Sequence, residues 1–183
     1  KDLTNIQIRS RDTYFALSLF DEMLHIPLFL ATNSINPKII PDFVRSVDIF
    51  PTLCDLVKIS FEQTVHGRSL ITLIQGNKIE EKPAYLHTAP YQKPHPTDSV
   101  GVRTGDYKYF RSSHNIKENV NLYDLKNDPF ENNNIAETNV ELVKQFEKIL
   151  TEMQNDNDSQ DENQENTEEQ QKIEFELKKM GYI

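Results

Sequence analysis

Cysteine is almost absent from this chain of 183 residues, because Cys54 is its single thiol. One cysteine cannot form a disulfide within the chain, and this scarcity favours the cytoplasm over an oxidising compartment. Long apolar runs are absent too: the longest, at residues 26–31, is far too short to span a membrane as a helix. The sequence also lacks an initiator methionine and a signal-like start, so we expect the C-terminal part of a longer protein.

Basic residues are outnumbered, with 20 Lys and Arg against 29 Asp and Glu. No basic patch indicates a nucleic-acid partner. The excess of acid is local, since residues 151–183 carry ten acids and three bases while the rest of the chain is close to neutral. The sequence gives no indication of an oligomeric state.

The most acidic and amide-rich block outside the tail is NLYDLKNDPFENNNIAE, at residues 121–137. A calcium loop of the EF-hand type needs oxygen ligands at its first, third, fifth and twelfth positions. A register from Asp124 puts Lys126 at the third position, and one from Asp128 puts Phe130 there. Both registers fail, so we interpret this block as a short strand followed by an Asp-Pro turn.

Residues 25–32, HIPLFLAT, are apolar on both faces, which is typical of a buried strand in a parallel sheet. Residues 46–59 have helical periodicity, and residues 67–77 predict a short helix with Ser69 as its cap and Gly76 as its stop. One face of the longer helix is apolar and is expected in the core, with the cysteine among its members: Val47, Phe50, Leu53, Cys54 and Val57.

Strand patterns begin after a charged linker at residues 79–82. Residues 84–88 and 121–125 each predict a strand, and residues 99–111 predict a hairpin. Gly105 and Asp106 form its two-residue loop, for which glycine at the first position indicates a type II′ turn. We therefore expect a small antiparallel sheet.

The register that this loop implies sorts the hairpin into two faces. The face expected to pack inward is apolar and consists of Val100, Val102, Tyr107 and Tyr109. On the other face Arg103 stands opposite Lys108, and two cations so placed repel each other unless an anion lies between them. Three alternatives follow: both extend into water, an acid of the small subdomain such as Asp124 or Glu131 binds at least one of them, or a substrate anion binds there.

The C-terminal part predicts helices. Thr138 and Glu141 make a capping-box pattern, followed by apolar residues at helical spacing. These residues are Val143, Phe146, Leu150 and Met153. Residues 154–166 contain no apolar residue and are expected to be a disordered acidic linker before a second helix at 167–180.

Several blocks in order resemble the C-terminal part of the sulfatase family, within the alkaline phosphatase superfamily. They are LFDEMLHIPLFL, VRSVDIFPTLCDLVKI, VHGRSLITLI, GVRTGDYKYF and LYDLKNDPFENNNIAE. The resemblance implies an α/β, alkaline-phosphatase-like fold. Residues 1–78 would be the C-terminal part of the large α/β domain, residues 79–137 a small antiparallel subdomain, and residues 138–183 a helical tail with its linker at 154–166.

The resemblance also implies hydrolysis of a sulfate ester, on a small molecule or a glycan, in the full-length protein. There a formylglycine made from Cys or Ser in a Cys/Ser-x-Pro-x-Arg motif attacks sulfur, and a divalent metal, usually calcium, holds the sulfate. This chain has no such motif, because Asp55 follows Cys54. Phe15 and Ala16 stand where relatives often carry a basic group. We therefore expect no catalytic residue and no metal ligand in this chain, and no activity from it alone.

Two histidines are candidates for binding substrate. His25 sits at the mouth of the predicted strand, where relatives often have arginine, and His95 lies in a proline-rich loop that would border the active-site cleft. Two other functions remain open. One is a phosphodiesterase or phosphoglycerol transferase of the same superfamily, and the other is a non-catalytic sulfatase-like protein.

Overall fold

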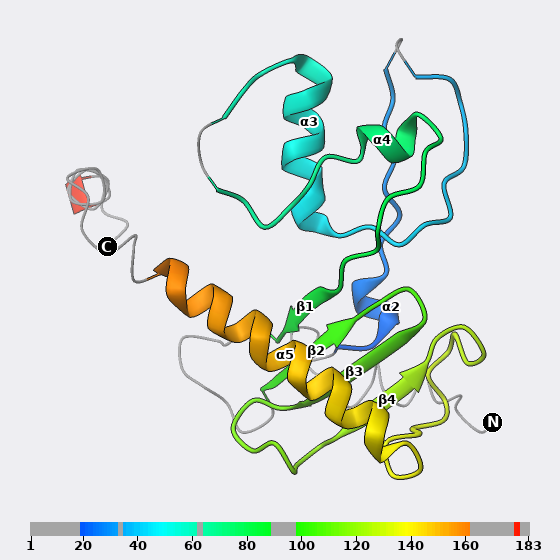
Figure 1. Cartoon of the computed structure of the whole chain (residues 1–183), viewed down its shortest axis with the longest axis vertical. Helices are drawn as coiled ribbons and strands as arrows, with labels where there is room; N and C mark the ends of the chain where they lie inside the picture. Colours follow the sequence, from blue (N-terminus) through cyan, green and yellow to red (C-terminus); the bar gives the residue numbers. More distant parts are fainter. Residues whose placement is uncertain (1–18, 33–34, 62–63, 89–97, 162–177, 180–183) are drawn as a thin grey trace.

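The computed structural model describes residues 19–32, 35–61, 64–88, 98–161 and 178–179. Its described elements form two lobes (Figure 1). The sheet lobe consists of strands β1 to β4 with helices α2 and α5, and the helical lobe consists of residues 35–78 with helices η1, α3 and α4. Residues 25–32 and 79–83 cross between the lobes. Among the described residues, no helix is both long and apolar enough to cross a membrane.

The sheet lobe is built on a four-stranded antiparallel sheet, as predicted. Its strands are β1 (Ala84–His87), β2 (Ser99–Arg103), β3 (Tyr107–Ser112) and β4 (Asn121–Asp124). They lie side by side in chain order. Each neighbouring pair is antiparallel.

The hairpin has the expected register but not the expected turn. Val102 pairs with Tyr109, and Arg103 with Lys108, as predicted. The type II′ assignment is wrong, because Gly105 does not have the positive φ that this turn requires. The Thr104 side chain closes the turn instead: its Oγ1 accepts a hydrogen bond of 3.0 Å from the Tyr107 backbone N–H.

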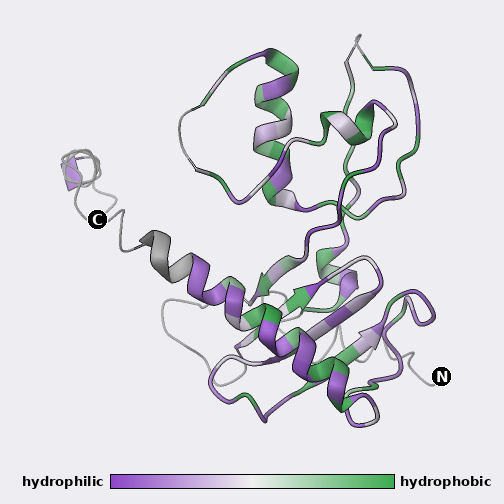
Figure 2. Cartoon of the chain, viewed as in Figure 1, coloured by the Kyte–Doolittle hydropathy of each residue, from purple (hydrophilic) through white to green (hydrophobic). Residues whose placement is uncertain are grey.

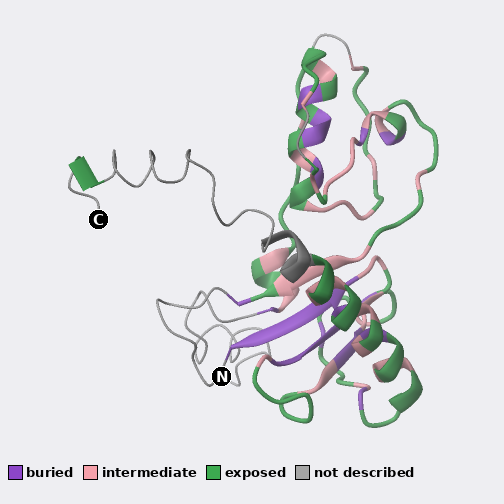
Figure 3. Cartoon of the chain, turned by 60° about the vertical axis from the view of Figure 1, so that its left-hand side comes forward, coloured by how far each residue is buried: buried purple, intermediate pink, exposed green. Residues whose placement is uncertain are grey.

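Helix α5 (Val140–Asp161) covers one face of the sheet (Figures 1 and 3). The core between them contains Val100, Val102, Tyr109, Leu122, Phe146 and Leu150. This confirms the apolar faces predicted for the hairpin and the helix. Burying each large apolar side chain contributes about 1.5–3 kcal/mol.

Two expectations about this helix were wrong. It begins at Val140, so Thr138 lies outside it and donates its hydroxyl to the Ile135 carbonyl rather than capping the first turn. It also continues to Asp161, so residues 154–161 of the predicted linker are helical. A helix anchored by packing extends at little cost, because only nucleation is unfavourable. The remaining linker and residues 167–177 of the second predicted helix lie outside the described residues.

The opposite face of the sheet is covered as well. Leu19, Phe110, Tyr123 and Leu125 form a second core there. The short helix α2 (Asp21–Leu24) packs against it through Phe20 and Leu24. Because both faces are covered, residues of β2 and β3 that point away from α5 are also buried (Figure 3).

The helical lobe contains η1 (Ser46–Asp48), α3 (Ile49–Val57) and α4 (Ile71–Ile74). The predicted helices are confirmed, Cys54 is buried, and Gly76 has a φ of 95° at the end of α4. The predicted inward face of α3 is wrong for its other members, since Val47, Phe50, Leu53 and Val57 are exposed.

The predicted strand at residues 25–32 is absent from the structure. This segment is mostly apolar (Figure 2), lies outside every strand of the described sheet and is largely exposed (Figure 3). Phe29 is 86% exposed and Ile26 is 69% exposed. A strand of a parallel sheet needs neighbouring strands for its backbone and layers on both faces, and the described residues provide neither beside this segment.

Candidate functional site

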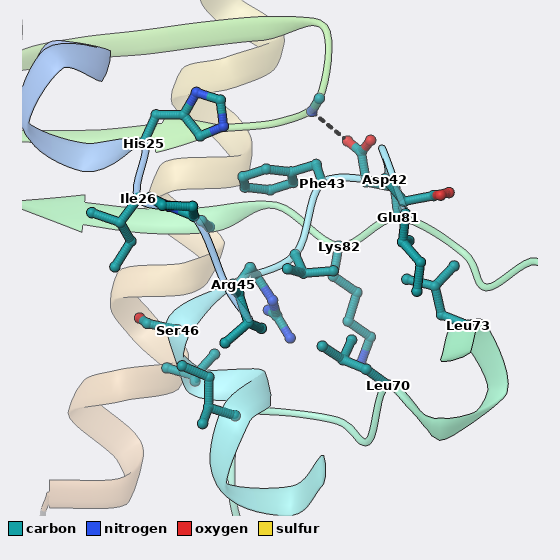
Figure 4. A pocket seen from close by; sticks show the side chains of 18 of the residues that line it. His25, Ile26, Asp42, Phe43, Arg45, Ser46, Leu70, Leu73, Glu81 and Lys82 are labelled. Carbon is teal, nitrogen blue, oxygen red and sulfur yellow. Dashed lines mark hydrogen bonds between the residues drawn. The ribbon is translucent and has the colours of Figure 1, made fainter. Parts of the chain in front are cut away.

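A cavity of about 1980 Å³ lies at the junction of the two lobes. It is lined by the crossing segments, by the 35–47 loop and by the β2–β3 turn. Figure 4 shows His25, Phe43, Arg45 and Lys82 among the side chains that surround it. The Glu81 carboxylate closes one side, where it accepts a hydrogen bond of 2.8 Å from the Gly105 backbone N–H.

His25 is the candidate substrate-binding residue that the structure places at this cavity. It is exposed and ends helix α2, where its backbone N–H donates to the Asp21 carbonyl at 2.9 Å. An exposed imidazole at the edge of a cavity can donate or accept a hydrogen bond to a ligand. His95, the other candidate, lies outside the described residues.

The carboxylate of Asp21 is held on two sides. Arg103 binds it through a two-pronged contact, with Nε to Oδ1 at 3.1 Å and Nη2 to Oδ2 at 2.9 Å. Lys108 also contacts Oδ1. Burial alone raises the pKa of Asp21, but the hydrogen bonds from Arg103 and Lys108 outweigh it and lower the pKa to about 2. Asp21 is therefore a charged, fixed group bound to Arg103 of the cavity wall.

Lys108 is completely buried. Its ammonium group donates to the Leu19 carbonyl at 3.0 Å and forms an ion pair with Glu131 at 2.8 Å. Glu131 is buried too, and it accepts a hydrogen bond of 2.7 Å from the Asp21 backbone N–H. Burial raises the pKa of Glu131, and the charge of Lys108 offsets only part of this. We call Asp21, Arg103, Lys108 and Glu131 the buried ion cluster.

This cluster decides between the three alternatives for the opposed cations. The solvent-exposed alternative is wrong, because Arg103 and Lys108 are both buried. A bridging acid is confirmed in Glu131, but not in Asp124, whose carboxylate accepts hydrogen bonds from Asn127 within the turn. The block at 121–137 is thus architecture, and its buried Glu131 is a counter-ion of Lys108.

The sequence reasoning missed Asp21. It lies 82 residues before Arg103 in the chain, and no local pattern links the two. The sequence indicates it only indirectly. Two opposed cations are stable together only with a negative charge nearby, and Asp21 is an acid at the start of a short helix in an otherwise apolar block.

A second arginine of the cavity wall, Arg45, is also engaged. Arg45 binds the buried carboxylate of Asp48 at 2.7 Å and donates to the carbonyls of Pro83 and His66. Burial alone raises the pKa of Asp48, but the hydrogen bonds from Arg45 and the backbone outweigh it and lower the pKa. Arg45 thus joins η1 to the crossing segment at residues 79–83.

The residues described by the structure do not fit a metal site. They contain no group of three or more His, Cys, Asp or Glu side chains that could hold an ion. In the turn at 124–133, Asp124 and Asp128 instead accept hydrogen bonds from Asn127 and from the Asn133 backbone.

Comparison with known proteins gives a consistent set of likenesses. A family model described as N-sulphoglucosamine sulphohydrolase, C-terminal, matches residues 13–156. Arylsulfatase K of Mus musculus is 27% identical over 144 residues, which cover 75% of this chain and 26% of the relative. A Delta 4,5-hexuronate-2-O-sulfatase of Bacteroides thetaiotaomicron is 31% identical over 143 residues, covering 74% of this chain and 28% of the relative.

A solved structure described as a complex with its substrate D-glucosamine-2-N,6-O-disulfate is also similar. It is 28% identical, with a TM-score of 0.50, over 65% of this chain and 25% of that chain. The chain therefore spans about a quarter of the length of the relatives it matches.

Proposed function

This chain belongs to the sulfatase family, in its N-sulphoglucosamine sulphohydrolase C-terminal part, and on that premise we propose that it forms one wall of the substrate site of an enzyme that hydrolyses sulfate esters. Its fold is the C-terminal part of an alkaline-phosphatase-like protein, with the small antiparallel sheet that the order of its blocks predicted. The match over residues 13–156 carries the proposal.

A sulfated saccharide is the substrate class that we propose. Two of the relatives are named or described with sulfated sugars, a hexuronate 2-O-sulfate and D-glucosamine-2-N,6-O-disulfate. The cavity is large enough for a saccharide and has polar side chains at its edge, including His25 and Lys82.

The remainder of the protein would supply the chemistry. The formylglycine nucleophile and a divalent metal, for which we propose calcium, would come from outside the described residues, which hold no metal cluster. The exposed apolar side chains support such a remainder, because Phe29, Ile39 and Val57 are 86%, 95% and 61% exposed. Exposed apolar side chains mark an interaction surface where they gather in one patch. We propose that the rest of the α/β domain covers these side chains.

His25 would contact the substrate from this chain. Its imidazole stands on a fixed helix end at the cavity, so it can donate a hydrogen bond to a sulfate or hydroxyl oxygen. His25→Ala in the full-length protein is expected to raise KM by about tenfold, the effect of losing a hydrogen bond to a charged group. His114→Ala, at an exposed histidine outside the cavity lining, is the matched control.

The deciding experiment measures sulfate release by the full-length protein from glucosamine sulfates, with an aryl sulfate and an aryl phosphodiester beside them. We expect turnover of the sulfate esters that is lost on chelation, and none from the 183-residue chain alone. Preference for the phosphodiester would favour the phosphoryl-transfer alternative. Saturable binding of the sulfated sugar without turnover of any substrate would favour a non-catalytic relative.

A further inference from the structure

Burying the charges of the buried ion cluster costs free energy of folding. Transferring an ammonium group from water to an interior costs several kcal/mol, and well-packed apolar side chains of the same volume are often as stable. Lys108 nevertheless stands on β3, on the same face as Phe110 of the second core, with no exposed surface. A cluster of this kind fixes the orientation of the segments that carry it, because charged hydrogen bonds hold their partners in one geometry.

The partners of the cluster come from segments far apart in the chain. Arg103 and Lys108 lie on the hairpin, Glu131 lies in the turn after β4, and Asp21 opens α2. Arg103 also lies over the Phe43 ring, 4.4 Å from its centroid, which adds the 35–47 loop of the helical lobe. The other three members of the cluster all contact Asp21: Arg103 and Lys108 bind its carboxylate, and Glu131 accepts a hydrogen bond from its backbone N–H.

Glu131 is held in a conformation that serves this convergence. Its φ is 52°, in the left-handed region that is strained for a residue other than glycine. The Glu131 N–H donates to the Asp128 carbonyl at 3.1 Å, so the Asp-Pro turn holds the backbone while the carboxylate points inward. The turn thereby places the Glu131 carboxylate in contact with Lys108 and with the backbone N–H at the start of α2.

A direct link joins this cluster to the cavity. Asp21 and His25 are the two ends of a single helical turn, closed by the hydrogen bond from the His25 N–H to the Asp21 carbonyl. With its carboxylate and its N–H both held, Asp21 has little freedom to rotate. The direction in which the chain leaves α2 at His25 is therefore set by the cluster.

We propose that Lys108 and Glu131 are positioning residues: acting through Asp21, they hold His25 and the segment at 25–32 in place at the wall of the cavity where a sulfated saccharide binds. The identity of that ligand rests on the proposed function. The positioning rests only on the contacts within this chain.

The opposite face of the sheet offers a matched control. Arg111 lies on the same strand, is also buried, and binds Glu147 of α5 at 2.8 Å. It is absent from the cavity wall and from the contacts of α2. Lys108→Met and Arg111→Met thus each remove one buried cation from β3, on opposite faces.

Amide hydrogen exchange in the 183-residue chain tests the positioning without any activity. We expect Lys108→Met to speed exchange of the His25 N–H by about tenfold or more, while α5 amides near Glu147 stay protected. Arg111→Met is expected to do the reverse. Unchanged His25 exchange in a folded Lys108→Met chain, or the same loss at His25 in both variants, would overturn the proposal.

Two further variants separate position from stability. If Lys108→Met does not fold, Arg103→Gln removes the other cation from Asp21 and leaves Lys108 in place, and faster His25 exchange is still expected. Lys108→Met with Glu131→Gln removes the stranded carboxylate, so unfolding midpoints should recover while His25 exchange stays fast. Recovery of slow His25 exchange in that double variant would contradict the positioning role.

Kinetics of the full-length protein add the functional readout. Lys108→Met is expected to raise KM for the sulfated sugar by about tenfold, as a small displacement of a binding group would, and Arg111→Met to leave KM unchanged. Equal KM values in the two variants would show that the cluster does not act on the site. Absence of turnover in every protein, wild type included, would sink the proposed function, and the exchange data would then decide the positioning alone.

Discussion

Tyr109 donates its hydroxyl to the Glu147 carboxylate at 2.6 Å, and this bond joins β3 to α5 across the main core of the sheet lobe. Arg111 holds the same carboxylate, with Nη2 to Oε1 at 2.8 Å. Burial alone raises the pKa of Glu147, but the bonds from Arg111 and Tyr109 outweigh it and lower the pKa. Glu147 is thus a charged acceptor inside a mostly apolar interface.

The first prediction concerns the alkaline titration of Tyr109. Burial, and then the Glu147 carboxylate, raise its pKa well above the usual 10.0. A raised pKa favours the neutral form in the folded state, so this contribution to stability is present below pH 10 and is lost as pH rises above it. We expect Glu147→Gln to lower the pKa of Tyr109, measured by tyrosinate absorbance with Tyr109→Phe as the subtraction control. An identical Tyr109 titration in the wild type and in Glu147→Gln would refute the effect of Glu147 on the pKa of Tyr109.

A second prediction compares two lysines. Lys108→Met strands the buried Glu131 and should lower the free energy of unfolding by about 3–5 kcal/mol, the usual result of breaking a buried ion pair. Lys144→Met removes an exposed pair with Glu141 and should change it by less than about 1 kcal/mol. Urea unfolding followed by circular dichroism gives both values. Similar midpoints for the two variants would mean that Lys108 is solvated in solution.

Acid unfolding should report on Asp21. Its pKa falls from 3.8 to about 2 in the folded state, so the stability it contributes is present above pH 4 and is lost as pH falls toward 2. The loss is at most about 2.5 kcal/mol, since one unit of pKa corresponds to about 1.4 kcal/mol. Asp21→Asn should flatten this part of the stability curve, and the exposed change Asp55→Asn should leave it unaltered. A curve that Asp21→Asn does not flatten would contradict the assignment.

The fourth prediction contrasts two glycines. A Cβ at position 67 would meet the backbone carbonyl of Val47, so Gly67→Ala must displace η1 and should cost about 1–3 kcal/mol. A Cβ at position 105 would meet only the end of the flexible Glu81 side chain, so Gly105→Ala should cost less than about 0.5 kcal/mol. Thermal melting of both variants checks the order, and a larger loss for Gly105→Ala would reverse it.

The sheet lobe was the most predictable part of the fold, because its information is local. The short turn at Gly105 was enough to set the hairpin register, even though the turn type was wrong. The register then placed Arg103 opposite Lys108, and their mutual repulsion correctly required an acid, of which Glu131 is one. Alternation and turn chemistry act over a few residues, so they can be read without knowledge of the rest of the chain.

The rest depended on contacts that no local pattern records. The apolar segment at 25–32 has the composition of a buried strand, but a strand exists only with neighbours to pair with, and the described chain offers it none. The inward face of α3 was misplaced for the same reason, since Phe50 and Leu53 are about half exposed among the described residues. In the candidate site His25 could be named from the resemblance, whereas its anchor Asp21 could not.

The chain order of the strands has a consequence for how the protein folds. A meander in which every strand pairs with its sequence neighbour needs only short loops to close, which is the topology of fast-folding units. The contacts of Asp21 with Arg103 and Glu131 span 82 and 110 residues, so their closure entropy is lost only late. We expect the sheet and α5 to fold first. The segment that ends at His25 would then pack onto Arg103 of β2 and Lys108 of β3 in a second, slower phase.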